Sequence, residues 1–138
     1  MVNLFCGQNG SGKTQKLISH ANAELERTEG LIVFIDKSDK RRLLVSNRIK
    51  FVNAKEYGLD STEAFYGFIC GVISGNYDIN RIYIDNLKDI VKASTEGECN
   101  DFVGRINELS EKYQVEFFIT LTTEKATSTQ VMELVYNG

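Results

Sequence analysis

The sequence contains no proline, so its turns have to be marked by Gly, Asn, Asp and Ser. It has one histidine, His20, and three cysteines, Cys6, Cys70 and Cys99, without a C-x-x-C pair. These few residues provide no zinc-type ligand set and argue against a disulfide framework. Because such cysteine usage is typical of reduced proteins, we expect a cytoplasmic location.

Long apolar runs and an excess of positive charge are lacking as well. No segment approaches the roughly 20 apolar residues of a transmembrane helix. The first expected strand already begins at residue 2, which leaves no room for a signal peptide. The formal net charge is −3, so no overall basic field attracts nucleic acid or a membrane. We therefore expect neither of them as a partner.

What is present is an ordinary globular composition, with 42% hydrophobic and 25% charged residues. A chain of 138 residues predicts a single domain spanning residues 1–138. Such a domain can bury a core but has little room for an inserted substrate domain. No repeat and no low-complexity segment is visible.

The most specific pattern is residues 7–14, which match the phosphate-binding sequence G-x-x-x-x-G-K-[ST] at every specified position. Its glycines permit backbone shapes that a Cβ forbids, so the loop's N–H groups can enclose a phosphate. Lys13 places a positive charge against the β- and γ-phosphates, and the Thr14 hydroxyl is a hard oxygen ligand for Mg²⁺. The candidate nucleotide-binding residues are Gly7, Gln8, Asn9, Gly10, Ser11, Gly12, Lys13 and Thr14.

The setting of this loop is a short apolar strand at residues 2–6 and a helix expected at residues 13–27. The helix directs its positive N-terminal end at the same phosphates. In motif and setting the chain resembles the P-loop NTPase superfamily. The resemblance implies ATP or GTP with Mg²⁺ as ligands, and a parallel sheet flanked by helices.

Strand and helix patterns alternate along the rest of the chain. Apolar runs predict strands at 31–36, 49–53, 81–85, 115–122 and 131–136, and helical spacing predicts helices at 61–74 and 96–113. Within the first of these helices, Gly67 and Gly71 suggest close packing against a neighbouring element. The alternation predicts a three-layer α/β fold with a mainly parallel sheet of five or six strands. The nucleotide is expected at the carboxyl ends of the central strands.

Two apolar runs end in an aspartate, Asp36 and Asp85, and either could supply the metal-side carboxylate. Asp85 lies about seventy residues after the P-loop, which leaves space for two crossover units. We therefore predict that Asp85, and not Asp36, holds Mg²⁺ through water opposite Thr14.

Asn86 follows this aspartate. In the RecA-like and thymidine-kinase-like branches of the superfamily the corresponding residue is usually a Glu that orients the attacking water. An amide cannot accept a proton, so this departure predicts slow hydrolysis. The catalytic candidates are thus Lys13, Asp85 and Asn86.

Further candidates lie on other segments. The RecA-like resemblance implies a γ-phosphate contact from Thr120 or Thr122, although Thr is also a common strand residue. Glu124, just beyond that strand, is an alternative base. The segment 37–50 carries six basic residues and one acidic residue, and it is either an anion-facing loop or a solvated charged loop.

The whole chain resembles a minimal RecA-like core. Residues 64–68, 75–79 and 84–85 also make it similar to small bacterial P-loop proteins of unassigned role, some labelled twitching-motility, PilT-type ATPases. We do not expect a pilus role, because 138 residues leave little space for the additional sensing domain of a retraction motor.

Three functions remain open from the sequence. The first is an ATP-binding protein with slow or partner-dependent ATPase activity, whose protein partner is unknown. The second is a small phosphotransferase such as a nucleoside kinase, with Arg41 and Arg42 on a mobile lid and Asp36 as the base. The third is a non-catalytic module that uses the nucleotide as a switch. Release of ADP without an added acceptor would separate the first from the other two.

Overall fold

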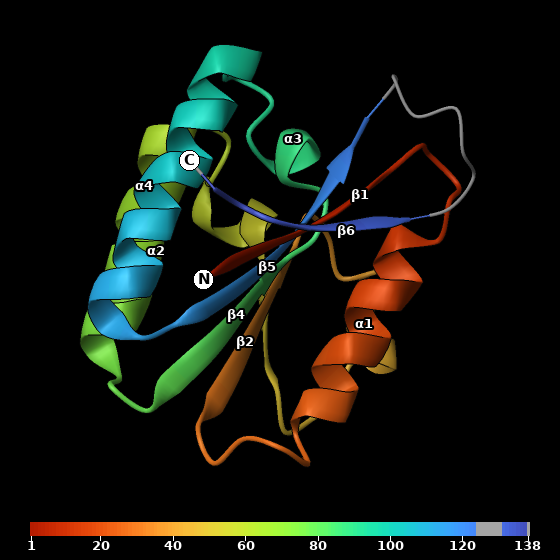
Figure 1. The fold of residues 1–138 in the computed structure, drawn as a ribbon, viewed down its shortest axis with the longest axis vertical. Coiled ribbons are helices and arrows are strands. Elements are labelled where there is room, and N and C mark those ends of the chain that lie inside the picture. The colour runs from red at the N-terminus through yellow and green to blue at the C-terminus, as the bar shows by residue number, and fades with distance from the viewer. Residues whose placement is uncertain (124–130, 138) are drawn as a thin grey trace.

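A six-stranded sheet forms the centre of the computed structural model, which describes residues 1–123 and 131–137 (Figure 1). Across the sheet the strands are β3 (Lys50–Asn53), β2 (Leu31–Asp36), β4 (Ile79–Ile84), β5 (Glu116–Thr122), β1 (Val2–Gly7) and β6 (Met132–Val135). Every neighbouring pair is parallel except β1 and β6, which run antiparallel. The prediction of a mainly parallel sheet of five or six strands is confirmed.

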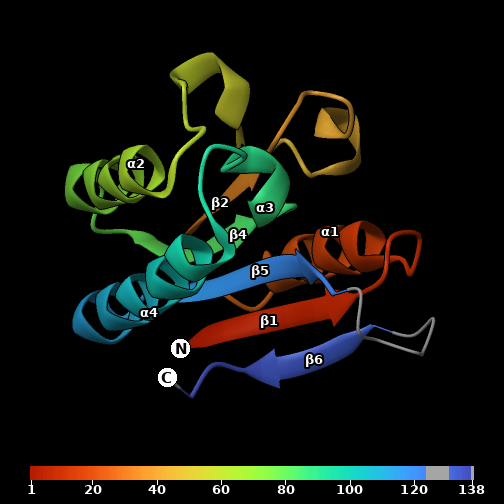
Figure 2. The same cartoon turned by 90° about the horizontal axis from the view of Figure 1, so that it is seen from above.

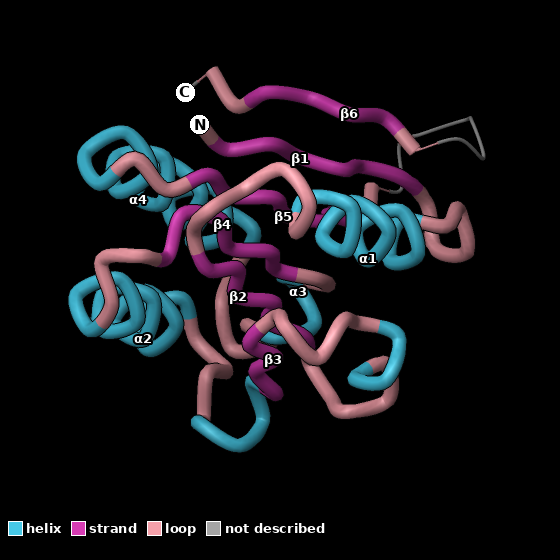
Figure 3. Tube along the Cα trace, turned by 90° about the horizontal axis from the view of Figure 1, so that it is seen from below, coloured by secondary structure: helices cyan, strands magenta, loops and turns pink. Residues whose placement is uncertain are grey.

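Helices cover both faces of this sheet (Figures 2 and 3). Helix α1 (Lys13–Glu24) packs on one face, and α2 (Thr62–Gly75) and α4 (Glu96–Tyr113) pack on the other. The short helix α3 (Leu87–Ile90) follows β4 directly. Two 3₁₀ helices, η1 (Arg42–Leu44) and η2 (Ala54–Tyr57), lie on either side of β3 in the chain. The three-layer arrangement expected from the sequence is therefore present.

The order of the strands determines which residues meet at the carboxyl edge. Strand β5 lies between β1, which enters the P-loop, and β4, which precedes Asp85. Gly7 pairs with Thr122 across one side of β5, and Ile84 pairs with Ile119 across the other. Parallel strands end at the same edge, so the P-loop and Asp85 come together there although they are far apart in the sequence.

Helix ends are capped by side chains that the sequence supplies locally. Ser61 Oγ accepts a hydrogen bond from the Ala64 amide at the start of α2. At the start of α4, Thr95 Oγ1 accepts from the Glu98 amide while Glu98 Oε1 accepts from the Thr95 amide. This reciprocal capping box satisfies two helix N–H groups and sets the first turn of the helix.

One expectation about α2 is wrong. Gly67 and Gly71 are exposed, and a Cβ built on either residue would meet no atom within 4 Å. They do not mediate close packing among the described residues. The helix instead buries Phe65, Ile69 and Ile73, which lie on its opposite side at i, i+4 and i+8.

We predict that Thr95→Ala lowers the free energy of unfolding by about 1 kcal/mol, because the first turn of α4 loses its side-chain cap. Urea denaturation of the variant and the wild type measures this difference. Thr95→Ser keeps an acceptor hydroxyl and should recover most of the loss. Equal stability of all three proteins would contradict the role of the cap.

Candidate nucleotide site

The P-loop connects β1 to α1 and adopts a backbone shape that depends on glycine. Gly10 and Gly12 have φ angles of 79° and 91°, in the left-handed region that costs energy for residues with a Cβ. Gly7 differs from these two, since a Cβ there would lie 2.5 Å from Ser11 Oγ and the Ser11 side chain would have to move. The loop turns back on itself through a hydrogen bond of 3.1 Å from the Ser11 amide to the Gln8 carbonyl.

Lys13 is buried at the start of α1, with 7% of its surface exposed. Its Nζ donates to the Gln8 carbonyl at 2.9 Å, and no described carboxylate forms an ion pair with it. Burial lowers the pKa of Lys13, and the Asp85 charge opposes this shift. Ser11 Oγ is also buried without a hydrogen-bond partner among the described residues. The loop thus holds a buried cation and an unpaired hydroxyl, an environment that fits an anionic ligand.

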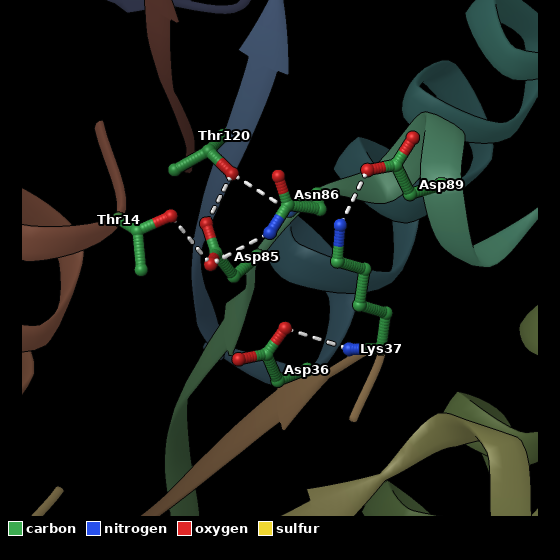
Figure 4. A network of polar contacts seen from close by, with 7 residues as sticks. All are labelled: Thr14, Asp36, Lys37, Asp85, Asn86, Asp89 and Thr120. Atoms are coloured by element: carbon green, nitrogen blue, oxygen red, sulfur yellow. Dashed lines mark hydrogen bonds and ion pairs between the residues drawn. The ribbon is translucent and has the colours of Figure 1, made fainter. Parts of the chain in front are cut away.

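Asp85 lies at the centre of a hydrogen-bond network at the carboxyl edge (Figure 4). Thr14 Oγ1 donates to Asp85 Oδ2 at 2.8 Å, and Thr120 Oγ1 donates to Oδ1 at 2.6 Å. Asn86 Nδ2 donates to Oδ2 at 2.9 Å. The carboxylate is fully buried, and these bonds from α1, β5 and its own strand end compensate its burial. The structure therefore places Asp85, rather than Asp36, against Thr14.

The chemistry of this donor set fits Mg²⁺. The Thr14 hydroxyl and the Asp85 carboxylate are hard oxygen donors, held next to each other beside the P-loop. Among the described residues there is no group of three His, Cys, Asp or Glu side chains that could hold a metal alone. Mg²⁺ usually binds through one or two protein groups together with substrate phosphates, which matches the small number of donors here.

Asp36 ends β2, the strand next to β4, and is fully buried. Its Oδ1 accepts a hydrogen bond of 2.7 Å from the Lys37 amide, whereas its Oδ2 has no partner among the described residues. Burial, and then the neighbouring charge of Asp85, raise the pKa of Asp36 to about 6. The parallel register of β2 and β4 explains why the Asp85 charge acts on Asp36. Ile35 pairs with Ile84, so Asp36 and Asp85, the residues that follow them, lie side by side.

The polar side chains around Asp85 have distinct contacts. The amide nitrogen of Asn86 points at Asp85 and its oxygen points away (Figure 4). Asn86 has a left-handed backbone with φ 59°, and its own N–H donates to Thr120 Oγ1 at 2.8 Å. The Thr120 hydroxyl is therefore occupied by two protein groups, which leaves Thr122 as the threonine free of that network. The alternative base Glu124 lies outside the described residues.

A cavity of about 680 Å³ opens beside this network. It is lined by Asn9 of the P-loop, by Asn86, Thr120 and Thr122, and by residues of α3 that include Asp89. Its volume lies in the range of small-molecule sites. A four-residue helix produces no periodic signal, so α3 could not be predicted from the sequence, and neither could the cavity that it lines together with distant segments.

The basic segment 37–50 is more paired than its sequence indicates. Arg42 Nη2 lies 2.8 Å from Asp39 Oδ1, and its guanidinium stacks 4.8 Å above the centre of the Phe51 ring. Arg48 forms an ion pair with Glu26 at 3.5 Å. The Lys37 ammonium lies 2.9 Å from Asp89 of α3. These contacts agree with a charged surface segment over most of its length.

Comparison with solved structures finds a similar fold in the crystal structure of KaiC-like protein PH0186 from the hyperthermophilic archaeon Pyrococcus horikoshii OT3. The TM-score is 0.62 at 19% sequence identity, and the match covers 92% of this chain and 64% of that chain. No family model matches the sequence, and no curated protein matches it either. Likeness at this identity concerns the fold.

The architecture is that of a three-layer α/β protein with a mainly parallel six-stranded sheet, and this fold is similar to that of the KaiC-like protein. None of the described helices is both long and apolar enough to cross a membrane.

We predict that replacing Asp36 by Asn changes how stability depends on pH. The folded state keeps this carboxyl protonated to about pH 6, whereas the ordinary value is 3.8. The raised pKa therefore stabilises the folded protein fully below pH 3.8, and this stabilisation is lost as the pH rises through 6. The difference in unfolding free energy, Asp36→Asn minus wild type, should grow by about 2–3 kcal/mol between pH 4 and pH 8.

Urea denaturation without metal or nucleotide measures this difference. Asp39→Asn is the control, because the Arg42 hydrogen bond lowers the pKa of Asp39 below 3.8, so its difference should stay nearly constant between pH 4 and pH 8. A difference for Asp36→Asn that does not vary with pH would contradict the assignment.

Proposed function

We propose that the chain binds ATP or GTP with Mg²⁺ at residues 7–14 and hydrolyses the nucleotide slowly, or in dependence on a protein partner. The observation that carries this proposal is the buried Lys13, which has no carboxylate counterion among the described residues and lies in a loop with two left-handed glycines. A γ- or β-phosphate is the anion whose charge and oxygen spacing suit such a loop.

The residues around the P-loop have three proposed roles: phosphate binding, metal binding and positioning of Asp85. Lys13 and the loop amides hold the phosphates, and Thr14 with Asp85 provides oxygens on the metal side. Magnesium bound there supplies positive charge that neutralises the phosphates. Thr120 and Asn86 hold the Asp85 carboxylate in one orientation, so we assign them positioning roles. This assignment uses one N–H of the Asn86 side-chain amide, so its oxygen and its second N–H are left for contact with water.

Asp36 is the carboxylate best suited to accept the proton of an attacking water. Asn86 cannot serve as a base, and both Asp85 oxygens already accept hydrogen bonds. Asp36 Oδ2 is buried and unpaired among the described residues, at the end of the strand beside Asp85. A pKa of about 6 leaves this carboxyl mostly ionised at neutral pH and still basic enough to take a proton.

A phosphotransferase remains the second candidate because of the cavity of about 680 Å³ beside the network. Asn9 and Thr122 line it together with α3, so an acceptor molecule has space next to the P-loop. Asp36 would act on the acceptor hydroxyl instead of water in that case. The thymidine-kinase-like resemblance belongs to this candidate, and we propose no pilus function.

We predict that Lys13→Ala weakens the binding of ATP and Mg²⁺ by about 10- to 100-fold, because a charge-assisted contact to the phosphates is lost. Isothermal calorimetry measures the affinity. Lys16→Ala is the matched control, since Lys16 is an exposed lysine of the same helix that pairs with Glu133 at 3.5 Å. Equal affinities of the wild type and Lys13→Ala would refute the proposed site.

We predict that steady-state phosphate release by the wild type is slow and falls by about 100-fold in Asp36→Asn, because a general base contributes roughly 10²–10⁴-fold. Lys13→Ala provides the blank. Asn86→Glu places a carboxylate after Asp85, and a gain of about 10-fold would show that position 86 contacts the attacking water.

Two other outcomes would change the assignment. Activity that survives in Asp36→Asn and collapses only in Glu124→Gln would place the base on Glu124. ADP formation that requires an added hydroxyl acceptor would favour the phosphotransferase.

A further inference from the structure

A second cavity, of about 510 Å³, lies at the carboxyl edge of the sheet beyond β2 and β3. Its lining is rich in lysines that come from three separate segments of the chain: the turn after β2, the helix η2 and the turn after α3. The charged residues that line it are Lys37, Lys40, Lys55, Lys92, Asp60 and Asp89. We call it the lysine cavity.

The charge of the lysine cavity is opposite to that of the whole protein. Four lysines against two aspartates give its lining a net charge of +2, whereas the chain carries −3. Lys37 pairs with Asp89 at 2.9 Å. Lys40, Lys55 and Lys92 form no ion pair within residues 1–123 and 131–137. Like charges that converge on one cavity repel each other, and an anion bound among them would relieve this repulsion.

The walls of the lysine cavity are held by hydrogen bonds between backbone and side chains. Asn53 Oδ1 accepts from the Lys55 amide at 3.1 Å and caps η2, and Gly58 ends η2 in a left-handed conformation. The Ala93 amide donates to the Asp60 carbonyl at 3.0 Å and joins the segment after η2 to the segment after α3. The lysines are therefore carried by backbone segments with defined positions.

Part of the lining is apolar. The buried side chains of Ala54, Leu59 and Ile90 also face this cavity. A volume of about 510 Å³ suits a small molecule, and no aromatic side chain on which a base could stack is among the lining residues. Both features favour a small organic anion over a nucleic-acid strand.

The lysine cavity adjoins the proposed nucleotide site. Asp89 lines both this cavity and the cavity beside the P-loop. Lys37 connects the two sites, since its ammonium binds Asp89 while its amide donates to Asp36 (Figure 4). A ligand that contacts Lys37 would therefore lie one residue from the Asp36 carboxyl.

We propose that the lysine cavity binds a small organic anion with two or more phosphate or carboxylate groups, at a site separate from the P-loop. Binding there does not require that the P-loop holds a nucleotide, so the proposal can succeed or fail independently of the proposed function.

The test is a titration of the full chain carrying Lys13→Ala, which weakens anion binding at the P-loop. Citrate and 2,3-bisphosphoglycerate serve as probes for the carboxylate and phosphate chemistries, and amide NMR shifts locate the site. We expect the shifts to concentrate in residues 37–40, 54–60 and 89–93. The double variant Lys55→Gln/Lys92→Gln should weaken binding by about 10-fold or more, because two charge-assisted contacts are lost.

The matched control is Lys50→Gln/Lys112→Gln, which removes the same charge from two exposed lysines outside the lysine cavity. It should leave the affinity unchanged. If both double variants weaken the binding of the anion equally, the loss comes from the overall charge of the protein, and the proposal is overturned. Amide shifts confined to residues 7–14 would overturn the proposal too. So would binding of an oligonucleotide, such as an oligo(dT) of about 15 nucleotides, without binding of either small anion. The same titration of the wild type separates the two sites by residue and covers the case in which Lys13→Ala does not fold.

Discussion

The buried carboxylate of Asp85 is the group on which the geometry of the site depends. A carboxylate without exposed surface is costly unless its oxygens accept hydrogen bonds. Thr14 supplies one from α1 and Thr120 supplies one from β5, so the bonds join α1 and β5 to the residue that follows β4. The P-loop helix is thereby fixed against the centre of the sheet, and one of the groups that satisfy Asp85, the Thr14 hydroxyl, is also a donor that suits Mg²⁺.

The strand order adds a second carboxylate to this arrangement. Because β2 and β4 are parallel neighbours in register, Asp36 and Asp85 end up side by side at the carboxyl edge. Asp85 is fully hydrogen-bonded, whereas Asp36 keeps one oxygen without a partner among the described residues, and its pKa is raised to about 6. Two aspartates thus acquire different properties from their surroundings, and this difference is the basis for proposing one as a metal-side ligand and the other as a proton acceptor.

Charge is distributed unevenly around this edge. The chain is acidic overall, yet a buried Lys13 lies in the P-loop and four lysines gather around the neighbouring cavity. The Lys37–Asp89 ion pair lies between the two regions. Both regions are at the carboxyl ends of parallel strands, where loops from several segments meet and can combine side chains that no single segment carries.

The sequence by itself determined the features that depend on neighbouring residues. Local patterns of glycine, charge and apolar spacing predict three of these features. They are the P-loop at residues 7–14, the positions of the central strands and the bounds of α4. It also favoured Asp85 over Asp36 on spacing, and the structure places Asp85 against Thr14. Only the tertiary structure decided the antiparallel direction of β6, the bond from Asn86 to Asp85, and the lysine cavity. These features depend on which strands pair and which loops meet, and such contacts between distant residues leave no periodic signal in the sequence.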